Sequence, residues 1–231
     1  MKRVIAAAVV ATATLVASCG GTVTPSAAPS PTLRAGIPTP VEQTATPVLP
    51  EQGEVAMTVA EGTKAAYIVR EQLARLDFPN DAVGITKQVE GAVVFKADGT
   101  VDAERSRLRV DLRTLNSDES RRDNFVRENT LQTSRFPFAE LAVQRVEGLS
   151  WPLPTSGHAE FQVHGDMTIH GVTKPLTWQV TATFSKSSVS GQATTNFKFG
   201  DFNMSVPRVF VVLSVEDNIQ LRIEFEMRRT G

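Results

Sequence analysis

The sequence is poor in features that identify many classes of protein. Its 231 residues include a single cysteine, Cys19, so an internal disulfide is excluded. Charges nearly cancel, with 24 Lys and Arg residues against 25 Asp and Glu residues, and no basic cluster has the pattern of a nucleic-acid-binding surface. The apolar stretch from Val4 to Val16 is too short to cross a bilayer as a stable helix. The composition therefore indicates neither a disulfide scaffold nor a polyanionic partner.

Motifs for catalysis and metal binding are also missing. The chain has no G-x-S-x-G elbow, no H-E-x-x-H, no Walker A sequence and no dinucleotide glycine motif. His158, His164 and His170 would lie on one strand with neighbours ~20 Å apart, too far to share a metal ion. Asp166, Thr168 and His170 lie in a row along the same strand, so they cannot converge as a triad. The sequence predicts no enzyme activity, no metal site and no cofactor.

The N-terminus has the charge and hydrophobicity typical of a secretion signal. Lys2 and Arg3 precede the apolar stretch, and small residues precede Cys19. The tetrapeptide Val-Ala-Ser-Cys that ends at Cys19 resembles a bacterial lipobox, which implies a diacylglyceryl group and a fatty acid such as palmitate on Cys19. We predict a lipoprotein signal peptide over residues 1–18 and a lipid anchor in a membrane of the cell envelope, outside the cytoplasm. The periplasm and the outside of a single-membrane cell both stay open, and an ordinary signal peptide with an incidental cysteine is the alternative.

Residues 19–53 are predicted to form a tether rich in Pro, Thr and Ala. Seven of the thirteen prolines of the chain fall within it, and its sequence has no apolar periodicity. Such a segment cannot bury enough apolar surface to offset the entropy of ordering, so we expect an extended linker. The folded domain is then expected over residues 54–231.

Two segments, Ala159 to Gly171 and Pro175 to Phe184, alternate apolar and polar residues almost without error. A period of two predicts strands with one apolar and one polar face. We expect the two strands to form a hairpin whose turn runs from His170 to Pro175, with Pro175 as the first residue of the returning strand. Further strands are predicted at residues 66–73, 91–95, 107–114, 138–146, 192–199, 209–215 and 219–227.

A short helix is predicted between two of these strands. Ser117 is its expected N-cap, and Asp123 and Arg127 are spaced to pair on its surface. About eight antiparallel strands with one apolar face can close into a barrel, which is either filled by side chains or holds one small ligand. The predicted fold class is all-β, an antiparallel barrel of about eight strands with one short helix near a barrel mouth. The pattern leaves a hollow and a packed interior open.

Residues 165–175, GDMTIHGVTKP, resemble the signature G-x-L-T-I-H-G-V-T-K/R-P of the YceI-like family, with Met167 in place of the usual leucine. Three further segments resemble family motifs in the same order: residues 117–125 with their RRD sequence, residues 135–139, and residues 207–225, which resemble a last hairpin. Together they span about residues 66–227. Members of this family are extracytoplasmic lipocalin-like barrels that bind polyisoprenoids and other long lipids. The resemblance implies a lipocalin-like β-barrel for this chain.

The resemblance and the strand parity together predict a function. We expect a non-catalytic lipid-binding protein that holds a polyisoprenoid or fatty-acid-like chain inside the barrel, for sequestration or transport. Arg122 is predicted to contact a polar head group or, alternatively, to tie the helix to neighbouring loops. The predicted barrel wall consists of ten apolar residues: Leu108, Val110, Leu112, Phe161, Val163, Met167, Ile169, Trp178, Val180 and Phe184.

A second interpretation stays open. In it the barrel is packed, and the protein is a non-catalytic interaction or stress-response module that engages a membrane partner. The apolar run from Val209 to Leu213 would supply a patch for such a partner unless it is buried on both faces. The sequence leaves the identity of the lipid and the oligomeric state open, a homodimer included.

Overall fold

The computed structural model describes residues 53–74, 77–208 and 212–231. The predicted signal peptide, Cys19 and the predicted tether up to residue 52 lie outside the described residues. Within the described ranges, no helix has the length and apolar character needed to cross a membrane.

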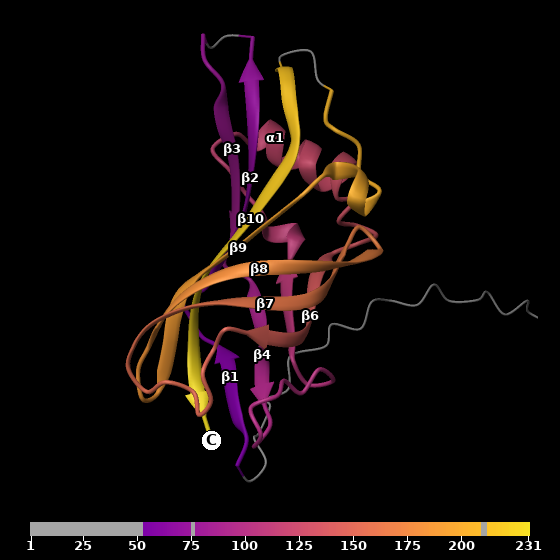
Figure 1. Ribbon diagram of the computed structural model, residues 1–231. Helices are drawn as coiled ribbons and strands as arrows, with labels where there is room; N and C mark the ends of the chain where they lie inside the picture. The colour runs from indigo at the N-terminus through magenta and orange to yellow at the C-terminus, as the bar shows by residue number, and fades with distance from the viewer. Residues whose placement is uncertain (1–52, 75–76, 209–211) are drawn as a thin grey trace, which may run out of the picture. The chain divides into compact units, whose positions relative to one another are not determined.

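The described residues form ten strands and four short helical segments, most of which are labelled in Figure 1. The strands are β1 (Val55–Val59), β2 (Lys64–Leu73), β3 (Asn80–Thr86), β4 (Val89–Phe95), β5 (Arg107–Asp111), β6 (Phe138–Glu147), β7 (Gly157–Ile169), β8 (Val172–Phe184), β9 (Ser188–Phe197) and β10 (Val212–Thr230). The helical segments are η1 (Leu112–Thr114), α1 (Ser120–Phe125), η2 (Val126–Thr130) and η3 (Phe199–Phe202).

Eight of the strands close into an antiparallel barrel in the order β1-β4-β5-β6-β7-β8-β9-β10, and β10 pairs with β1 to complete it. Strands β2 and β3 extend the sheet beyond the barrel. β2 pairs with the edge of β10 that also pairs with β1, opposite the edge that pairs with β9. This is feasible because β10 has 19 residues: Met227–Thr230 pair with β1, and residues 212–224 pair with β2. Between β1 and β2, the Thr63 hydroxyl donates to the backbone oxygen of Glu226 and accepts from its N–H, both at 3.0 Å. The predicted barrel fold is confirmed.

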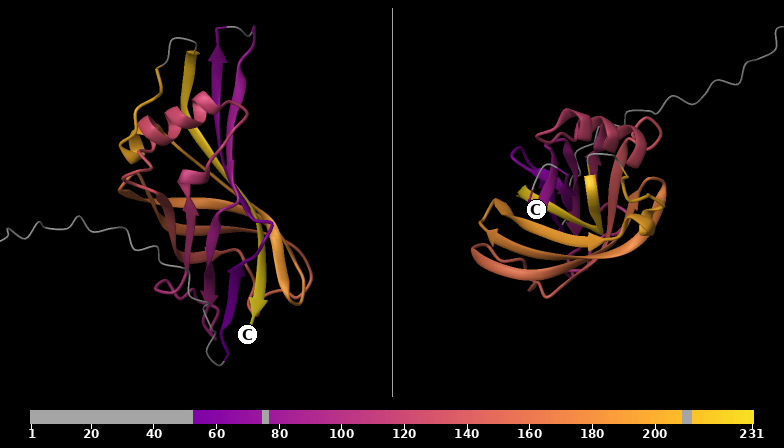
Figure 2. Two further views of the ribbon diagram at one scale, coloured as in Figure 1. Left: turned by 180° about the vertical axis from the view of Figure 1, so that it is seen from behind. Right: turned by 90° about the horizontal axis from the view of Figure 1, so that it is seen from above.

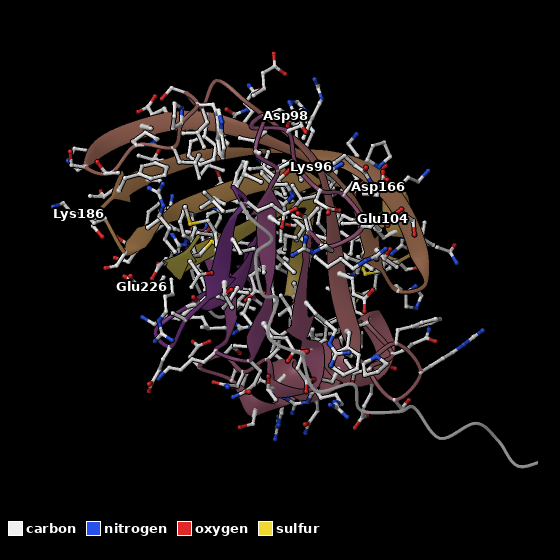
Figure 3. The ribbon with its side chains drawn as sticks, turned by 90° about the horizontal axis from the view of Figure 1, so that it is seen from below. Lys96, Asp98, Glu104, Asp166, Lys186 and Glu226 are labelled. Carbon is white, nitrogen blue, oxygen red and sulfur yellow. The ribbon has the colours of Figure 1, made fainter. Side chains whose placement is uncertain are left out.

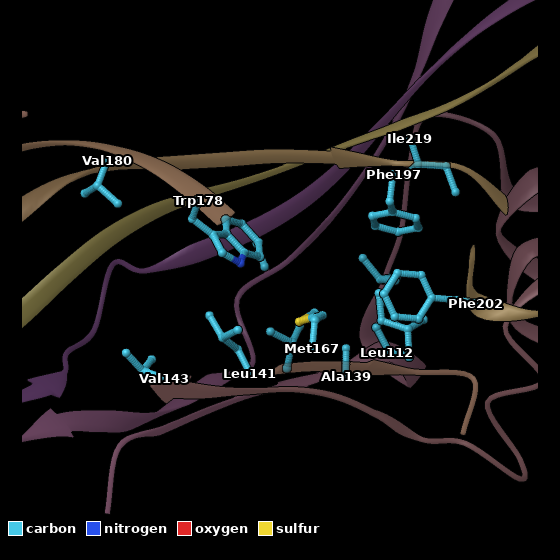
Figure 4. Close-up of a cluster of buried hydrophobic side chains, with 14 of the residues drawn as sticks. Leu112, Ala139, Leu141, Val143, Met167, Trp178, Val180, Phe197, Phe202 and Ile219 are labelled. Carbon is cyan, nitrogen blue, oxygen red and sulfur yellow. The ribbon is translucent and has the colours of Figure 1, made fainter. Parts of the chain in front are cut away.

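The alternation predicted for β8 is also confirmed. Its inward side chains from Trp178 to Phe184 are buried, whereas the three side chains between them, Gln179, Thr181 and Thr183, are exposed. Figure 4 shows part of the resulting core, with Val143 and Val180 at one end and Phe197 and Phe202 at the other. Charged side chains such as Lys96 and Lys186, both labelled in Figure 3, are exposed. The barrel therefore has an apolar interior and a polar outer surface, as its period-two sequence dictates.

The turn of the β7–β8 hairpin is shorter than predicted. Only His170 and Gly171 lie in it, at φ 51° and 74°, and β8 begins at Val172. Two successive positive φ angles give a two-residue turn whose twist matches that of paired strands. The two strands therefore pair directly on either side of the turn, beginning with Ile169 and Val172. Pro175 consequently lies inside β8, opposite Asp166, rather than at its start. Its missing N–H leaves no gap in the ladder, because β9 pairs with β8 only from Gln179 onward.

Two other predicted strands have different bounds. β5 ends at Asp111, because the carboxylate of Asp111 accepts from the N–H of Arg113 and begins the helical turn η1. The predicted last hairpin is a single strand, β10, in the described residues from 212 onward. The polar sequence Glu216-Asp217-Asn218, which resembles a turn, lies in an irregular stretch between the pairs Val215–Glu71 and Ile219–Val69. A β-bulge of this kind absorbs extra residues without reversing the strand.

The helix also begins later than predicted. Its N-cap is Glu119, whose side chain accepts from the N–H of Arg121. Ser117 instead donates its N–H and hydroxyl to the buried carboxylate of Asp123, at 2.9 and 2.7 Å. Arg127 binds the backbone oxygen of Leu115 and not Asp123. The acidic residue of the RRD sequence thus fastens the loop before the helix to the helix itself.

Candidate functional site

An apolar cavity of about 630 Å³ lies in one half of the barrel. Its wall comes from the barrel strands β5 to β9, from β2 and β3, from the first half of β10, and from α1 and η2, which cover it. Figures 1 and 2 show α1 lying beside β2 and β10 at the end from which β2 and β3 extend. A methylene group is about as large as a water molecule, which occupies about 30 Å³ in the liquid. The cavity therefore has room for about twenty chain atoms.

The cavity exists because small residues face it from several strands. Ala65 on β2, Ala82 on β3 and Ala139 on β6 are all buried and line it. In the other half of the barrel, larger side chains meet in the core, as Phe161 and Phe184 do with ring centroids 6.4 Å apart. The interior is thus packed at one end and hollow at the other, which decides between the two possibilities that the sequence left open.

Five of the ten residues predicted for the barrel wall line this cavity, and five do not. Those that line it are Val110, Leu112, Met167, Ile169 and Trp178. Val180 and Phe184 are buried in the packed half, and Leu108, Phe161 and Val163 are partly buried against the same core. Strand parity identifies the face of a side chain but not its depth along the barrel, which explains the division. Contact of any of these residues with a ligand stays a prediction.

Arg122 fastens the helical cover to the sheet. One of its guanidinium nitrogens lies 2.8 Å from Glu71 on β2, and the other binds Asp118 and Ser117. Burial alone would lower the pKa of Arg122, but its hydrogen bonds to Asp118 and Glu71 outweigh this effect and raise it. Arg122 does line the cavity, yet its guanidinium is already engaged by two carboxylates. This geometry favours the structural alternative, and a head-group contact stays a prediction.

Tyr67, the only tyrosine of the chain, adds a polar group to the wall next to this ion pair. Its ring leans over Gly84 on β3, where a Cβ atom would meet the ring at 2.1 Å. Burial raises the pKa of Tyr67 to about 12, although the nearby Arg122 opposes the shift. Tyr67 is therefore a neutral phenol, able to donate a hydrogen bond, throughout the physiological pH range.

The sequence reasoning missed the half of the wall that β2, β3 and β10 supply. Strand β3 was not predicted at all, because its buried positions hold Ala82, Gly84 and Thr86, none of which is a large apolar residue. Inward residues of β2 do alternate in the sequence, with Ala65, Val69 and Leu73 among them, and this was the signal that could have placed β2 in the wall. β2 lies outside the closed barrel and faces the helix. This position depends on its long-range pairing with β10, which a local sequence pattern does not reveal.

The histidines have separate surroundings. His158 and His164 each bind a threonine of β8 through Nδ1, at 2.9 and 3.0 Å. His170 lies 3.3 Å from the backbone oxygen of Phe202 and packs edge-on against Phe136. Among the described residues, no group of three or more His, Cys, Asp or Glu side chains is arranged to hold a metal ion. His170 thus ties the β7–β8 turn to its neighbours in the fold.

Comparison with known proteins identifies the family. The sequence model of the YceI-like domain matches residues 61–227, which span β2 to most of β10. The chain belongs to the YceI-like domain family. Among solved structures, a polyisoprenoid-binding domain from Saccharophagus degradans superposes on this YceI-like domain with a TM-score of 0.57 at 11% identity, covering 76% of this chain and 98% of that one. BcnA from Burkholderia cenocepacia gives 0.53 at 16% identity, covering 75% and 99%. No curated protein matches the chain.

Proposed function

We propose that this YceI-like domain holds one long-chain lipid, a polyisoprenoid or a fatty-acid-like chain, in its cavity. The observation that carries the proposal is a cavity of about 630 Å³ whose wall is mostly apolar. The similarity in fold to a domain described as polyisoprenoid-binding supports it. The protein would act without catalysis, by sequestering the lipid or carrying it between membranes.

Burial of the chain supplies enough free energy for this role. Removing a methylene from water contributes ~0.8 kcal/mol, so about twenty chain atoms give at most ~16 kcal/mol. The lower bound typical of drug-sized ligands, ~0.3 kcal/mol per atom, gives ~6 kcal/mol. The dissociation constant is therefore expected to be tens of micromolar or tighter. Because the apolar part of the wall can distinguish chains only by length and width, hydrocarbon tails of equal length should contribute equally to binding.

The proposal places the domain at a membrane. The lipobox-like sequence at Cys19 supports acylation there, and two or more acyl chains hold a protein firmly on a membrane surface. The proline-rich segment up to residue 53 would then let the barrel reach along or away from that surface. Replacing Cys19 by serine should release the protein from the membrane fraction, while retention of this variant on the membrane would contradict acylation as the anchor.

The alternative, an interaction module with a packed barrel, is disfavoured by the cavity. A titration separates the two. The protein should take up one equivalent of a twenty-carbon prenol or fatty acid and bind a ten-carbon chain far more weakly, in a competition assay with a fluorescent lipid. Absence of uptake of both long chains by folded protein would contradict the proposal.

A further inference from the structure

The cavity wall contains an indole N–H that the described part of the fold leaves without a hydrogen-bond partner. Trp178 is 1% exposed, lies on β8 and lines the cavity. Its indole Nε1 has no hydrogen-bond partner anywhere in the described parts of the chain. Figure 4 shows this nitrogen on the edge of the ring that faces Met167 and Leu141, across the interior of the barrel. By contrast Trp151, the other tryptophan, donates its Nε1–H to the backbone oxygen of Ala97 at 3.1 Å.

An unpartnered indole N–H favours a ligand that places a hydrogen-bond acceptor beside it. Indole nitrogen can only donate a hydrogen bond, and buried donors in proteins are nearly always paired. A plain hydrocarbon against Trp178 would leave the donor unpaired, whereas an oxygen atom of a ligand would accept from it. Thr130 of η2 also has a buried hydroxyl without a partner among the described residues and lines the same cavity. A hydroxyl both donates and accepts, however, so it does not select an acceptor. The remaining unpartnered atom of the described wall, Nε of Arg222, belongs to a cation and lies 3.8 Å from a carboxylate oxygen of Glu224.

The charge distribution of the wall decides between a neutral and an anionic acceptor. The charged residues that line the cavity all come from β2, β10 or the segment that contains α1: Glu71, Glu119, Arg121, Arg122 and Arg222. The lining residues of β6 to β9, where Trp178 lies, carry no charge. An anion beside Trp178 would lose its hydration, and no lining residue of these four strands would supply a positive charge to compensate it. A neutral oxygen loses far less.

We propose, on the basis of the function proposed above, that the bound lipid carries a neutral hydrogen-bond acceptor, a carbonyl, ester or ether oxygen, on the part of the molecule that lies against Trp178. The oxygen accepts from the indole Nε1–H inside the barrel, away from the charged residues of the helical cover. The ligand is therefore an oxygenated lipid that inserts its neutral polar group, rather than a bare hydrocarbon tail, to the depth of Trp178.

A matched pair of ligands tests this. One is a twenty-carbon prenyl methyl ketone, and the other is the hydrocarbon of the same length and branching. Dissociation constants for both are measured with the wild-type protein and with Trp178→Phe, which keeps an aromatic ring but removes the donor. We expect wild type to prefer the ketone roughly three- to tenfold, the effect of one hydrogen bond, and the ratio to fall to about one in the variant. Phe197→Leu is the control, because Phe197 lines the cavity without a donor and its loss should weaken both ligands alike.

An NMR measurement on the wild-type protein avoids dependence on the fold of the variant. With the indole nitrogens labelled, the Trp178 signal should move downfield with the ketone and not with the hydrocarbon, while the Trp151 signal serves as an internal reference. Equal affinities of wild type for the two ligands, or a preference that survives in Trp178→Phe, would overturn the inference and leave lipid binding intact. Failure of both ligands to bind would instead overturn the proposed function.

Discussion

Filling the cavity from one strand should shorten the lipid that the protein accepts. Ala82 is 4% exposed, lines the cavity and lies on the short edge strand β3, so a large side chain there extends into the space. Ala82→Trp adds about nine non-hydrogen atoms, which displace about eight or nine of the roughly twenty chain atoms that fit. Each methylene left in water forfeits up to ~0.8 kcal/mol, so a twenty-carbon chain that leaves eight or nine methylenes outside loses at most ~6–7 kcal/mol. Even a third of this loss, about 2 kcal/mol, would weaken the affinity for the twenty-carbon chain about thirtyfold.

The assay is competition with a fluorescent lipid by chains of about eight to twenty carbons, each matched in head group. Wild type should gain affinity up to about twenty carbons, and Ala82→Trp only up to about twelve. Ile85→Trp is the matched control, because Ile85 lies on the opposite face of the same strand and is 40% exposed. An unchanged length profile in folded Ala82→Trp, or an equal change in Ile85→Trp, would refute the assignment of the cavity as the binding site.

Three further predictions concern the elements around the cavity. Arg122→Met should lower the free energy of unfolding by about 3 kcal/mol in urea titrations, because it leaves Glu71 buried and unpaired, and Glu71→Leu in the same protein should restore most of the loss. Gly171→Ala should cost about 2 kcal/mol or more, because φ is 74° and the new Cβ would approach the Phe136 ring to 2.6 Å. The absorbance of Tyr67 should titrate near pH 12. Because the pKa of Tyr67 is higher in the folded than in the unfolded state, its neutral form contributes about 2–3 kcal/mol to the free energy of unfolding. This contribution is complete below pH 10 and is lost as the pH rises through 12.

Each of these has a control within the chain. Gly157 also has a positive φ, 89°, but nothing lies within 4 Å of a Cβ placed on it, so Gly157→Ala measures the backbone cost alone. A loss in Gly171→Ala no larger than in Gly157→Ala would exclude the clash with Phe136. If the Glu71→Leu, Arg122→Met double variant stayed as unstable as Arg122→Met, the ion pair would not be the cause. A Tyr67 midpoint near pH 10 would show that the phenol is solvated.

The barrel could be predicted because its main signal is local. Strands β5 to β9 face water on one side and the interior on the other, so their sequences alternate, and the two positive φ angles at His170 and Gly171 occur at residues that tolerate them. The predicted strand bounds were wrong where the local sequence pattern and the long-range strand pairing favour different structures. Residues 216–218 have the composition of a turn, yet β2 pairs with β10 before and after them and makes the stretch a bulge.

The cavity could be predicted only in part. Parity placed both Trp178 and Val180 inside, but only Trp178 lines the hollow half. The position of a side chain along the barrel axis depends on which residues oppose each other across the barrel. It therefore depends on how β10 closes the barrel. Alanines such as Ala65 and Ala82 help to create the space without a sequence signal for it, because a small residue in a strand can equally mark a close backbone contact. The ion pair of Glu71 with Arg122 joins residues 51 positions apart and has no local signature.

Native mass spectrometry of the protein purified without detergent, followed by organic extraction, tests the central claim most directly. The account predicts a single added mass per barrel that extracts as a lipid with a chain of about twenty atoms and a neutral oxygen, or uptake of such a lipid when it is added to unoccupied protein. Folded protein that shows no added mass and takes up neither prenyl nor fatty-acyl chains would contradict it.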